Sequence, residues 1–570
     1  MIGDIKLKLI FNLFDYREKK NFFLLTSFMF INSLLEIFSL GLIIPIIGLM
    51  FQQNIDLELL KYLLNFFNIS ELNIFTSIIY FFLIFQIIKI LFSIYYLFYE
   101  TKYIHSFKER IASRLMHNYF SQNYIFFIKN NSAKLLRNIT YGVDMSVVFL
   151  FQFLKVLLDL IMLSFIFIFL SFYNFQITFF LISGVLLFFY IYSFNFKNKL
   201  SEYGYKKQKH LNKKIQYFQE SIENIKIIKL FIKEKFFFNK FKFENSQISK
   251  LSISSEFFRS LPKPLIELFL IFCISLILLN YAYSENYIAP KIFETLAVYL
   301  AAALRVMPST SRILSGYLAL KNSYPEIENI SKEIKKEIKI SEKKYKKFEF
   351  KKYIDIRIKK FFYTNDKDFF LKNIIFKIAK GEKVGIVGKS GSGKSSIIDL
   401  ILGLIKTDNG FVKVDGRPIH ENIKSWHNLI GYVPQRITMI EDTIRNNILF
   451  GRNSNDYNEK KLLELIRNFR LSKFVNSLPN GLDSIISEKG LNISGGEMQR
   501  IAICRAMLHN PDILIMDEAT SSLDSATEDQ ILDYINKLSD KTVIFISHKM
   551  NTLKYCDSIY KLDNYKFLKI

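Results

Sequence analysis

The first 320 residues contain long apolar runs separated by polar segments. A helix needs about 20 consecutive, mostly apolar residues to cross the hydrocarbon core of a membrane. Six runs meet this requirement: Phe22–Met50, Ile74–Tyr99, Val147–Leu170, Phe175–Phe194, Leu261–Tyr283 and Ile292–Leu318. The pattern therefore predicts six membrane-spanning helices over residues 1–320. The first run is too long for a signal peptide, so we interpret it as an uncleaved span.

Lysine and arginine are distributed unevenly between the segments that join these runs. They are dense in residues 102–137 and 197–250 and sparse after the first, third and fifth runs. Because cationic loops stay in the cytoplasm, both dense segments, both termini and the C-terminal half are predicted to be cytoplasmic. The dense segments have helical periodicity and are too long for simple loops, so we expect them to extend the spans into the cytoplasm.

The pattern changes after the sixth run. Residues 321–347 are rich in Lys and Glu and predict a charged linker, which we interpret as a solvated helix without chemistry. From residue 348 to 570, short β-rich runs alternate with helical stretches. The runs are Lys383–Val387, Leu429–Val433, Ile513–Met516 and Thr542–Ile546. This alternation indicates an α/β domain around a largely parallel sheet.

Composition supports the membrane interpretation. The chain has 570 residues, a formal net charge of +25, 59 phenylalanines and only 3 cysteines. So few cysteines, far apart, exclude a disulfide scaffold and show no metal-ligand spacing. A basic chain can bind nucleic acid, but basic residues also collect in the cytoplasmic loops of membrane proteins. Because the apolar runs require a bilayer, we expect membrane lipid and no nucleic acid as a partner.

A glycine-rich loop follows the strand Lys383–Val387 and fits the pattern G-x-x-x-x-G-K-[ST]. Glycines let backbone N–H groups turn toward phosphate oxygens, and the following helix N-terminus adds positive potential. Lys394 is expected to reach the β- and γ-phosphates of ATP, and the Ser395 hydroxyl to bind Mg²⁺. The residues predicted to bind ATP here are Gly388, Lys389, Ser390, Gly391, Ser392, Gly393, Lys394, Ser395 and Ser396.

The strand Ile513–Met516 ends in two carboxylates, Asp517 and Glu518. Many strands end in this way, but together with an upstream phosphate loop the pair suits magnesium-phosphate chemistry. Asp517 is predicted to hold the metal. Glu518, one residue further on, is predicted to polarise the attacking water as a general base.

The segment Ile493-Ser494-Gly495-Gly496-Glu497 precedes a helical run and places small residues at a helix N-terminus, which can form a second anion site. Here the chain resembles the ATP-binding-cassette (ABC) family, whose signature is usually Leu-Ser-Gly-Gly-Gln. Ile replaces Leu, and Glu replaces Gln. The resemblance assigns the phosphate contacts to the Ser hydroxyl and the Gly amides, so ATP contacts are expected from Ser494, Gly495, Gly496 and Glu497.

Further elements of the ABC pattern follow in the family's order. The resemblance assigns Tyr363 to stacking on adenine, and Gln435 to a catalytic loop that senses Mg²⁺ and the membrane domain. It assigns Asp524 to the loop that crosses to the partner and His548 to a switch at the γ-phosphate. The implied fold is a membrane all-α domain of six helices with long cytoplasmic extensions, followed by an α/β P-loop nucleotide-binding domain.

The resemblance also implies an assembly. In the ABC family each ATP lies between the phosphate loop of one cassette and the signature of another, and this chain has one of each. We therefore expect a twofold homodimer that ATP closes and hydrolysis opens. The segments near 118–131 and 211–222 are expected to carry that motion to the spans.

Cations inside the predicted spans point toward the cargo, because charges in a membrane are costly and usually functional. The candidates are Lys89, Lys263, Arg305 and Arg312. Convergent cations suit a pyrophosphate group. The alternatives are snorkelling to the headgroups or pairing with Glu36, Glu267 or Glu294. An amphipathic stripe over Asp56–Asn68 predicts a short outer helix, lying either in the membrane interface or against the protein.

Within the ABC exporters, the stretch Leu304–Arg312, the short outer helix and the single cassette resemble the lipid-linked oligosaccharide flippases of bacterial protein glycosylation. This resemblance implies transfer of a polyprenyl-diphosphate-linked glycan to the outer leaflet of a bacterial inner membrane. The alternatives are an exporter of lipid A-type lipids, drugs or peptides, and an ATP-gated channel or regulator.

Overall fold

The computed structural model describes residues 13–42, 74–283, 289–335, 347–361, 371–389, 391–407, 409–452, 457–486, 493–563 and 566–570. The chain divides into two compact units. The helical unit comprises residues 1–122 and 130–339, and the sheet unit comprises residues 123–129 and 340–570. The expected outer helix over Asp56–Asn68 lies outside the described residues and stays a prediction.

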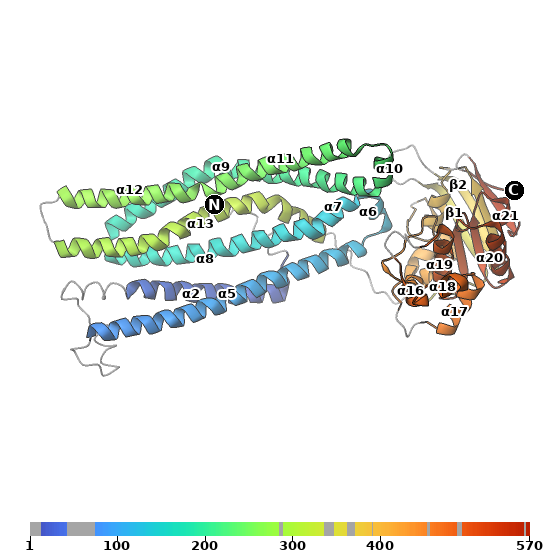
Figure 1. Ribbon diagram of the computed structural model, residues 1–570, viewed down its shortest axis with the longest axis horizontal. Coiled ribbons are helices and arrows are strands. Elements are labelled where there is room, and N and C mark those ends of the chain that lie inside the picture. Colours follow the sequence, from blue (N-terminus) through green and yellow to red (C-terminus); the bar gives the residue numbers. More distant parts are fainter. Residues whose placement is uncertain are drawn as a thin grey trace. The chain divides into compact units, whose positions relative to one another are not determined.

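The helical unit is built from long helices that run alongside one another (Figure 1). Their bounds are α2 (Tyr16–Gly41), α5 (Ile74–Phe120), α7 (Ser132–Arg137), α8 (Val143–Tyr173), α9 (Phe175–Glu223), α10 (Ile225–Leu230), α11 (Glu234–Ser260), α12 (Pro262–Tyr283) and α13 (Ala289–Lys335). A π-helical turn, Asn138–Gly142, joins α7 to α8.

Four helical stretches in the described part of the chain are long and apolar enough to cross a membrane. They are Tyr16–Ser39, Ile79–Phe120, Ser132–Phe172 and Phe175–Glu223. These stretches overlap the first four expected spans. The fifth and sixth expected spans are helical, in α12 and α13, but several of their side chains lie outside the described set. The count of six spans stays a prediction.

The helices extend well beyond the length of a span, as the sequence predicts. Helix α5 has 47 residues and α9 has 49, whereas about 20 suffice to cross the hydrocarbon core. The expected motion-transmitting segment near 211–222 lies inside α9, and the chain reverses only after Glu223, through α10. Its role in carrying motion stays a prediction.

The charged linker is partly buried. Residues 321–335 continue α13, and Glu326 and Ile330 lie in the interior. Arg137 donates to Glu326 Oε1 at 3.0 Å and Gln208 donates to Oε2 at 3.1 Å. Burial raises the pKa of Glu326, against the opposing effect of Arg137. The interpretation of residues 326–335 as solvated was therefore wrong, because a count of Lys and Glu does not reveal which face of a helix is covered.

Glycines allow α13 to lie close to its neighbours. A Cβ at Gly204 of α9 would collide with the backbone carbonyl oxygen of Asn322, and a Cβ at Gly142 would lie 2.9 Å from Ile330. A side chain at Gly204 would push α13 away from α9, whereas one at Gly142 would displace the end of the Ile330 side chain.

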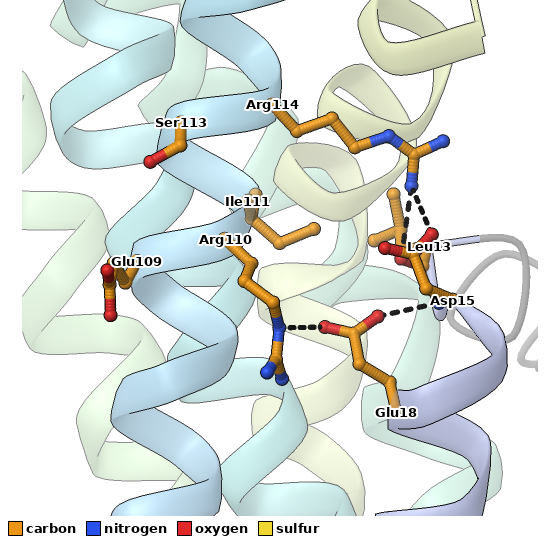
Figure 2. Close-up of a pocket in the computed structure, with 8 residues that line it drawn as sticks. All are labelled: Leu13, Asp15, Glu18, Glu109, Arg110, Ile111, Ser113 and Arg114. Atoms are coloured by element: carbon orange, nitrogen blue, oxygen red, sulfur yellow. Dashed lines mark hydrogen bonds and ion pairs between the residues drawn. The ribbon is translucent and has the colours of Figure 1, made fainter.

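The N-terminal end of α2 is fixed to α5 by charge pairs (Figure 2). Arg110 Nε donates to Glu18 Oε1 at 2.7 Å, and Arg114 Nη1 lies 3.3 Å from Asp15 Oδ1. These residues line a polar cavity of 530 Å³. Each carboxylate is paired with one arginine, and these two ion pairs orient the start of the first span against the second.

The sheet unit contains a mainly parallel sheet of strand order β12-β11-β3-β10-β9-β6 and an antiparallel sheet of order β2-β1-β4-β5. The strands of the parallel sheet are β3 (Lys383–Gly388), β6 (Ile430–Val433), β9 (Ile513–Asp517), β10 (Thr542–Ile546), β11 (Ser558–Asp563) and the antiparallel edge strand β12 (Lys566–Lys569). The antiparallel sheet contains β1 (Tyr353–Phe361), β2 (Leu371–Ala379), β4 (Asn409–Val414) and β5 (Arg417–Pro418). A third pair joins β7 (Asp442–Thr443) to β8 (Ile485–Ile486).

Helices complete the sheet unit. They are α6 (Tyr124–Lys129), α14 (Lys394–Ile401), α15 (Ile423–Asn428), α16 (Ile444–Leu449), α17 (Glu459–Asn468), α18 (Ser472–Ser477), α19 (Gly495–Met507), α20 (Ser525–Lys537) and α21 (Met550–Leu553), with short 3₁₀ turns at Ile419–Glu421 and Gly481–Asp483. All five residues of β9 and of β10 are buried, as a parallel sheet covered on both faces requires. Helix α6 belongs to this unit, and Ile125 packs against its core.

Candidate functional site

The glycine-rich loop connects β3 to α14. Gly391 and Gly393 have φ values of 79° and 105°, in the left-handed region that glycine adopts without strain. Lys394 Nζ donates to the carbonyl oxygens of Gly388 at 2.7 Å and Lys389 at 3.1 Å, so the ammonium is held over the loop. Burial lowers the pKa of Lys394, while the Glu518 and Asp517 carboxylates act in the opposite direction.

Three neighbouring strands bring the other predicted catalytic side chains to the same edge of the sheet. Glu518 follows β9, Gln435 follows β6 and His548 follows β10. Gln435 Nε2 donates to Glu518 Oε2 at 2.7 Å, and His548 Nε2 lies 3.4 Å from Glu518 Oε1. Glu518 itself has a φ of 49°, a strained conformation for a non-glycine residue that is common at functional sites.

Asp517 is the buried end residue of β9. Burial and, to a smaller extent, the neighbouring Glu518 carboxylate raise the pKa of Asp517 to about 6, against the opposing charge of Lys394. The Asp517 and Glu518 carboxylates are adjacent and face the single ammonium of Lys394. A divalent cation would stabilise this arrangement, because the cation adds positive charge where burial disfavours the ionised carboxylate of Asp517.

The residues present fit a magnesium-nucleotide complex. The Ser395 side chain is exposed at the start of α14, and a Cβ at Gly391 would meet no atom within 4 Å, so space remains over the loop. The Ser392 hydroxyl is buried without a hydrogen-bond partner in the described part of the chain, which leaves a polar atom for a ligand. Ser390 and Tyr363 lie outside the described residues, so the adenine contact stays a prediction.

The signature segment forms the N-terminus of α19. Ser494 caps the helix: its hydroxyl accepts from the Glu497 N–H at 3.3 Å, while Glu497 Oε2 accepts from the Ser494 N–H at 2.8 Å. The glutamate that replaces the usual glutamine thus closes a capping box. A Cβ at Gly495 would lie 3.4 Å from Ser522 Cβ, and one at Gly496 would lie 3.3 Å from the Ser522 carbonyl oxygen, so both glycines lie next to the segment Ser522–Leu523.

The segment after β9 is fixed to the signature helix. Gln499 Nε2 donates to Ser521 Oγ at 3.0 Å, and Gln499 Oε1 accepts from the Ser522 N–H at 3.0 Å. Asp524 ends this segment as the N-cap of α20, where the Thr527 N–H donates to its side chain at 2.9 Å and lowers its pKa. Motion of the signature helix and of this loop is therefore coupled.

In the helical unit, two of the four predicted substrate cations converge on one carboxylate. Lys89 Nζ lies 3.2 Å from Glu36 Oε2, and Arg305 Nη2 lies 2.7 Å from Glu36 Oε1. The three residues come from α5, α13 and α2. Lys89 and Glu36 are largely covered, whereas the Arg305 side chain is 47% exposed. The pairing with Glu36 that the sequence offered as an alternative is present, and it leaves this cluster with one positive charge in excess.

Arg312 has a partner that sequence reasoning missed. Its Nε and Nη2 donate to Asp159 of α8 at 2.9 and 2.6 Å, and Nη2 also donates to Ser309 Oγ at 2.9 Å. Asp159 is completely buried. The sequence feature that could have revealed this partner is that Asp159 is the one acidic residue within the apolar run Val147–Leu170. Lys263, the fourth candidate, has an exposed side chain near the start of α12.

These features define a class: a helical membrane protein joined to a phosphate-loop nucleotide-binding domain. Two family models match the chain. One is described as "ABC transporter transmembrane region" and matches residues 22–302; the other is described as "ABC transporter" and matches residues 371–521. Together the matches span more than half of the sequence. The chain belongs to the ABC transporter family.

Relatives and solved structures agree with this assignment. The "ATP-dependent lipid A-core flippase" of Idiomarina loihiensis is 38% identical over 196 residues, which is 34% of this chain and 34% of that protein. The "Iron-sulfur clusters transporter ATM1, mitochondrial" of Saccharomyces cerevisiae is 36% identical over 256 residues, which is 44% of this chain and 37% of that protein. The match thus spans about a third of the length of each relative. A solved bacterial Atm1-family ABC exporter with ATP bound has a TM-score of 0.79 at 20% identity, covering 97% of this chain and 94% of the other. This likeness shows the fold, that of an ABC exporter half-transporter.

Proposed function

We propose that the protein is an ATP-driven exporter that hydrolyses ATP at the carboxyl edge of its parallel sheet. The observation that carries this proposal is the Glu518 carboxylate, which lies within 2.7 Å of Gln435 Nε2 and 3.4 Å of His548 Nε2, beside the phosphate loop. A carboxylate held by an amide and an imidazole is positioned to accept a proton from water. A regulator that only bound nucleotide would not need this arrangement.

The chain's own residues divide the work of phosphoryl transfer. Lys394 and the loop amides would bind the β- and γ-phosphates, and Ser395, Asp517 and Gln435 are the residues that would hold Mg²⁺, which would supply charge neutralisation at the phosphate oxygens. Gln435 and His548 orient the Glu518 carboxylate, which would accept a proton from the attacking water. His548 orients the γ-phosphate.

The working assembly is a homodimer. The Ser494 cap and the Gly495–Gly496 amides present an anion site, and the phosphate loop presents another. Pairing the two sites between twofold-related copies encloses two nucleotides. ATP binding closes this interface and hydrolysis opens it. Helix α6, which packs on the sheet unit of its own chain, transmits the motion to the membrane helices through α5 and α7.

The proposed cargo is a polyprenyl-diphosphate-linked oligosaccharide, moved from the cytoplasmic to the outer leaflet of a bacterial inner membrane with the termini in the cytoplasm. The cluster of Glu36, Lys89 and Arg305 supports it, because two cations share one carboxylate and Arg305 remains half-exposed. A diphosphate gains charge-assisted hydrogen bonds from such a cluster. Lys263 is a further contact, whereas Arg312 is bound by Asp159 and is the weakest candidate.

A second cargo class is an anionic lipid of lipid A type, without a polyprenyl diphosphate. The Idiomarina loihiensis relative, named as a lipid A-core flippase, favours this alternative. Both cargoes carry phosphate groups, so the same cluster serves either. Comparing a lipid-linked oligosaccharide with a lipid A-type lipid in one transport assay separates them.

The test is translocation of a fluorescent diphosphate lipid in proteoliposomes, with ATPase activity measured on the same sample. Arg305→Ala is expected to abolish translocation and to retain basal ATPase activity, because Lys89 still neutralises Glu36. Arg305→Lys keeps the cation and serves as the matched control. Glu36→Gln removes the competing carboxylate and should lower the KM for the lipid. Normal translocation by Arg305→Ala would exclude the cluster as a cargo site.

A further inference from the structure

One lysine joins the two turns that carry Glu518 and His548. Lys549 directly follows His548, after β10, and its Nζ donates to the Thr520 carbonyl oxygen at 3.1 Å and to Glu528 Oε2 at 2.9 Å. Thr520 lies two residues after Glu518, in the turn that follows β9, and Glu528 lies in the first turn of α20. A single ammonium thus connects both turns to the start of α20.

The carboxylate that binds Lys549 is buried. The Glu528 side chain is 3% exposed, whereas the Lys549 side chain is 40% exposed. In the described part of the chain, Lys549 is the cation paired with Glu528, and Glu528 Oε1 is buried there without a hydrogen-bond partner. Because a buried carboxylate is costly unless it is paired, Glu528 holds the ammonium of Lys549 in one place.

The backbone around His548 is fixed as well. Ser547 is buried, and its hydroxyl accepts from the Lys549 N–H at 3.0 Å and donates to Thr552 Oγ1 at 3.2 Å. The His548 side chain, by contrast, is exposed and lies 3.4 Å from Glu518 Oε1. This distance is long for a hydrogen bond, so the contact alone does not fix the imidazole. The position of His548 therefore depends on its turn, which Ser547 and Lys549 hold.

The same lysine constrains the turn after Glu518. Its acceptor, the Thr520 carbonyl oxygen, also accepts from the Leu523 N–H at 3.2 Å, and the Glu518 carbonyl oxygen accepts from the Ser521 N–H at 3.1 Å. Glu518, at the start of these two turns, has the strained φ of 49°. A strained residue keeps its conformation only where its surroundings determine it. The hydrogen bond from Lys549 to Thr520 is one such constraint.

We propose that Lys549 is a positioning residue for ATP hydrolysis, which holds the turns of Glu518 and His548 in fixed places relative to each other. This inference rests on the roles proposed above for those two residues. Because its ammonium is bound by Thr520 and Glu528, Lys549 acts through its neighbours and not on the nucleotide. A shift of about 1 Å at a reacting group can lower a rate about a hundredfold, so such a constraint matters for turnover.

The experiment uses the full-length, detergent-solubilised protein and the variant Lys549→Met, which keeps an unbranched side chain and removes the ammonium. The matched control is Lys554→Met. Lys554 also follows β10 and also donates to α20, to Asp529 Oδ1 at 3.2 Å, but both side chains of that pair are exposed. Calorimetry measures ATP affinity and counts the binding sites, so that kcat refers only to protein that binds ATP.

Lys549→Met is expected to lower kcat at least about tenfold with ATP affinity unchanged, whereas Lys554→Met should change neither. The double variant Lys549→Met/Glu528→Gln separates positioning from folding, because it leaves no unpaired buried carboxylate. Positioning predicts that this double variant regains the half-life of the folded protein but not kcat. Wild-type kcat in Lys549→Met, an equal loss in Lys554→Met, or a kcat that returns together with the half-life would overturn the proposal.

His548→Ala, measured in the same way, distinguishes this inference from the proposed function on which it rests. If His548→Ala has wild-type kcat, the role proposed for His548 is wrong, and the inference about Lys549 is rejected with it. If kcat is low in His548→Ala but normal in Lys549→Met, the proposed catalytic arrangement stands and only the role of Lys549 is rejected.

Discussion

Because Asp159 and Arg312 form an ion pair but differ in burial, replacing Arg312 should destabilise the fold far more than replacing Asp159. Asp159 is fully buried in α8, whereas the Arg312 side chain is 50% exposed on α13. Replacing Arg312 with Met leaves a carboxylate inside the membrane domain without its bidentate partner. Replacing Asp159 with Asn leaves a half-exposed guanidinium that still donates to Ser309.

The magnitudes follow from burial. Removing one partner of a buried pair costs about 3–5 kcal/mol, because the remaining charge stays desolvated, and an unpaired Asp at the centre of a span costs a similar amount. Arg312→Met should therefore destabilise the fold by about 3 kcal/mol or more. Asp159→Asn loses charge-assisted hydrogen bonds at a half-exposed group, for which about 1 kcal/mol is expected after solvent screening. The double variant Arg312→Met/Asp159→Asn should recover most of the stability that Arg312→Met loses.

The assay is the half-life of the detergent-solubilised protein at fixed temperature, since membrane proteins usually unfold irreversibly. If the lost stability lowers the activation free energy of unfolding by the same amount, about 3 kcal/mol shortens the half-life about a hundredfold and about 1 kcal/mol shortens it about fivefold. Val156→Ala on the same helix measures the effect of packing alone. Equal half-lives for Arg312→Met and Asp159→Asn, or a double variant no better than Arg312→Met, would refute the reasoning.

Three further outcomes are expected. Glu518→Gln should lower ATPase activity by about a hundredfold or more while ATP binding measured by calorimetry persists; unchanged turnover contradicts the general-base role. Lys394→Ala should abolish ATP binding in the same measurement, because the loop loses its ammonium over the β/γ-phosphates; wild-type affinity argues against that contact. Gly204→Ala should cost about 1–3 kcal/mol by overpacking and shorten the half-life of the folded protein, whereas an unchanged half-life would mean that α9 and α13 separate freely.

The strands that carry the expected nucleotide site were predictable because their signals are local. A strand, a glycine-rich turn and a helix occupy one short stretch, and the four strands expected from apolar runs appear as β3, β6, β9 and β10. The antiparallel sheet was not anticipated. In β1, charged residues alternate with buried isoleucines, a half-buried pattern that is weaker than the continuous apolar runs of the parallel strands.

The partners of the membrane charges were harder to predict, because they depend on how three helices pack. The sequence offered Glu36, Glu267 and Glu294 as partners, and only the packing of α2, α5 and α13 shows that Lys89 and Arg305 share Glu36. Arg312 and Asp159 are 153 positions apart. Helical periodicity assigns each residue to a face of its own helix but does not say which faces meet.

The charge balance of the membrane domain bears on both the cargo and the assembly. Asp159 neutralises Arg312, and Glu36 neutralises only one of Lys89 and Arg305, so these five residues leave one positive charge in each chain. A diphosphate diester carries two negative charges. We infer that one chain does not balance such a cargo, whereas two chains related by a twofold axis supply two such clusters and match it. On this reasoning the proposed homodimer would serve the proposed cargo as well as the nucleotide, and a dimer in which only one copy carries Arg305→Ala should lose affinity for the diphosphate without losing the fold.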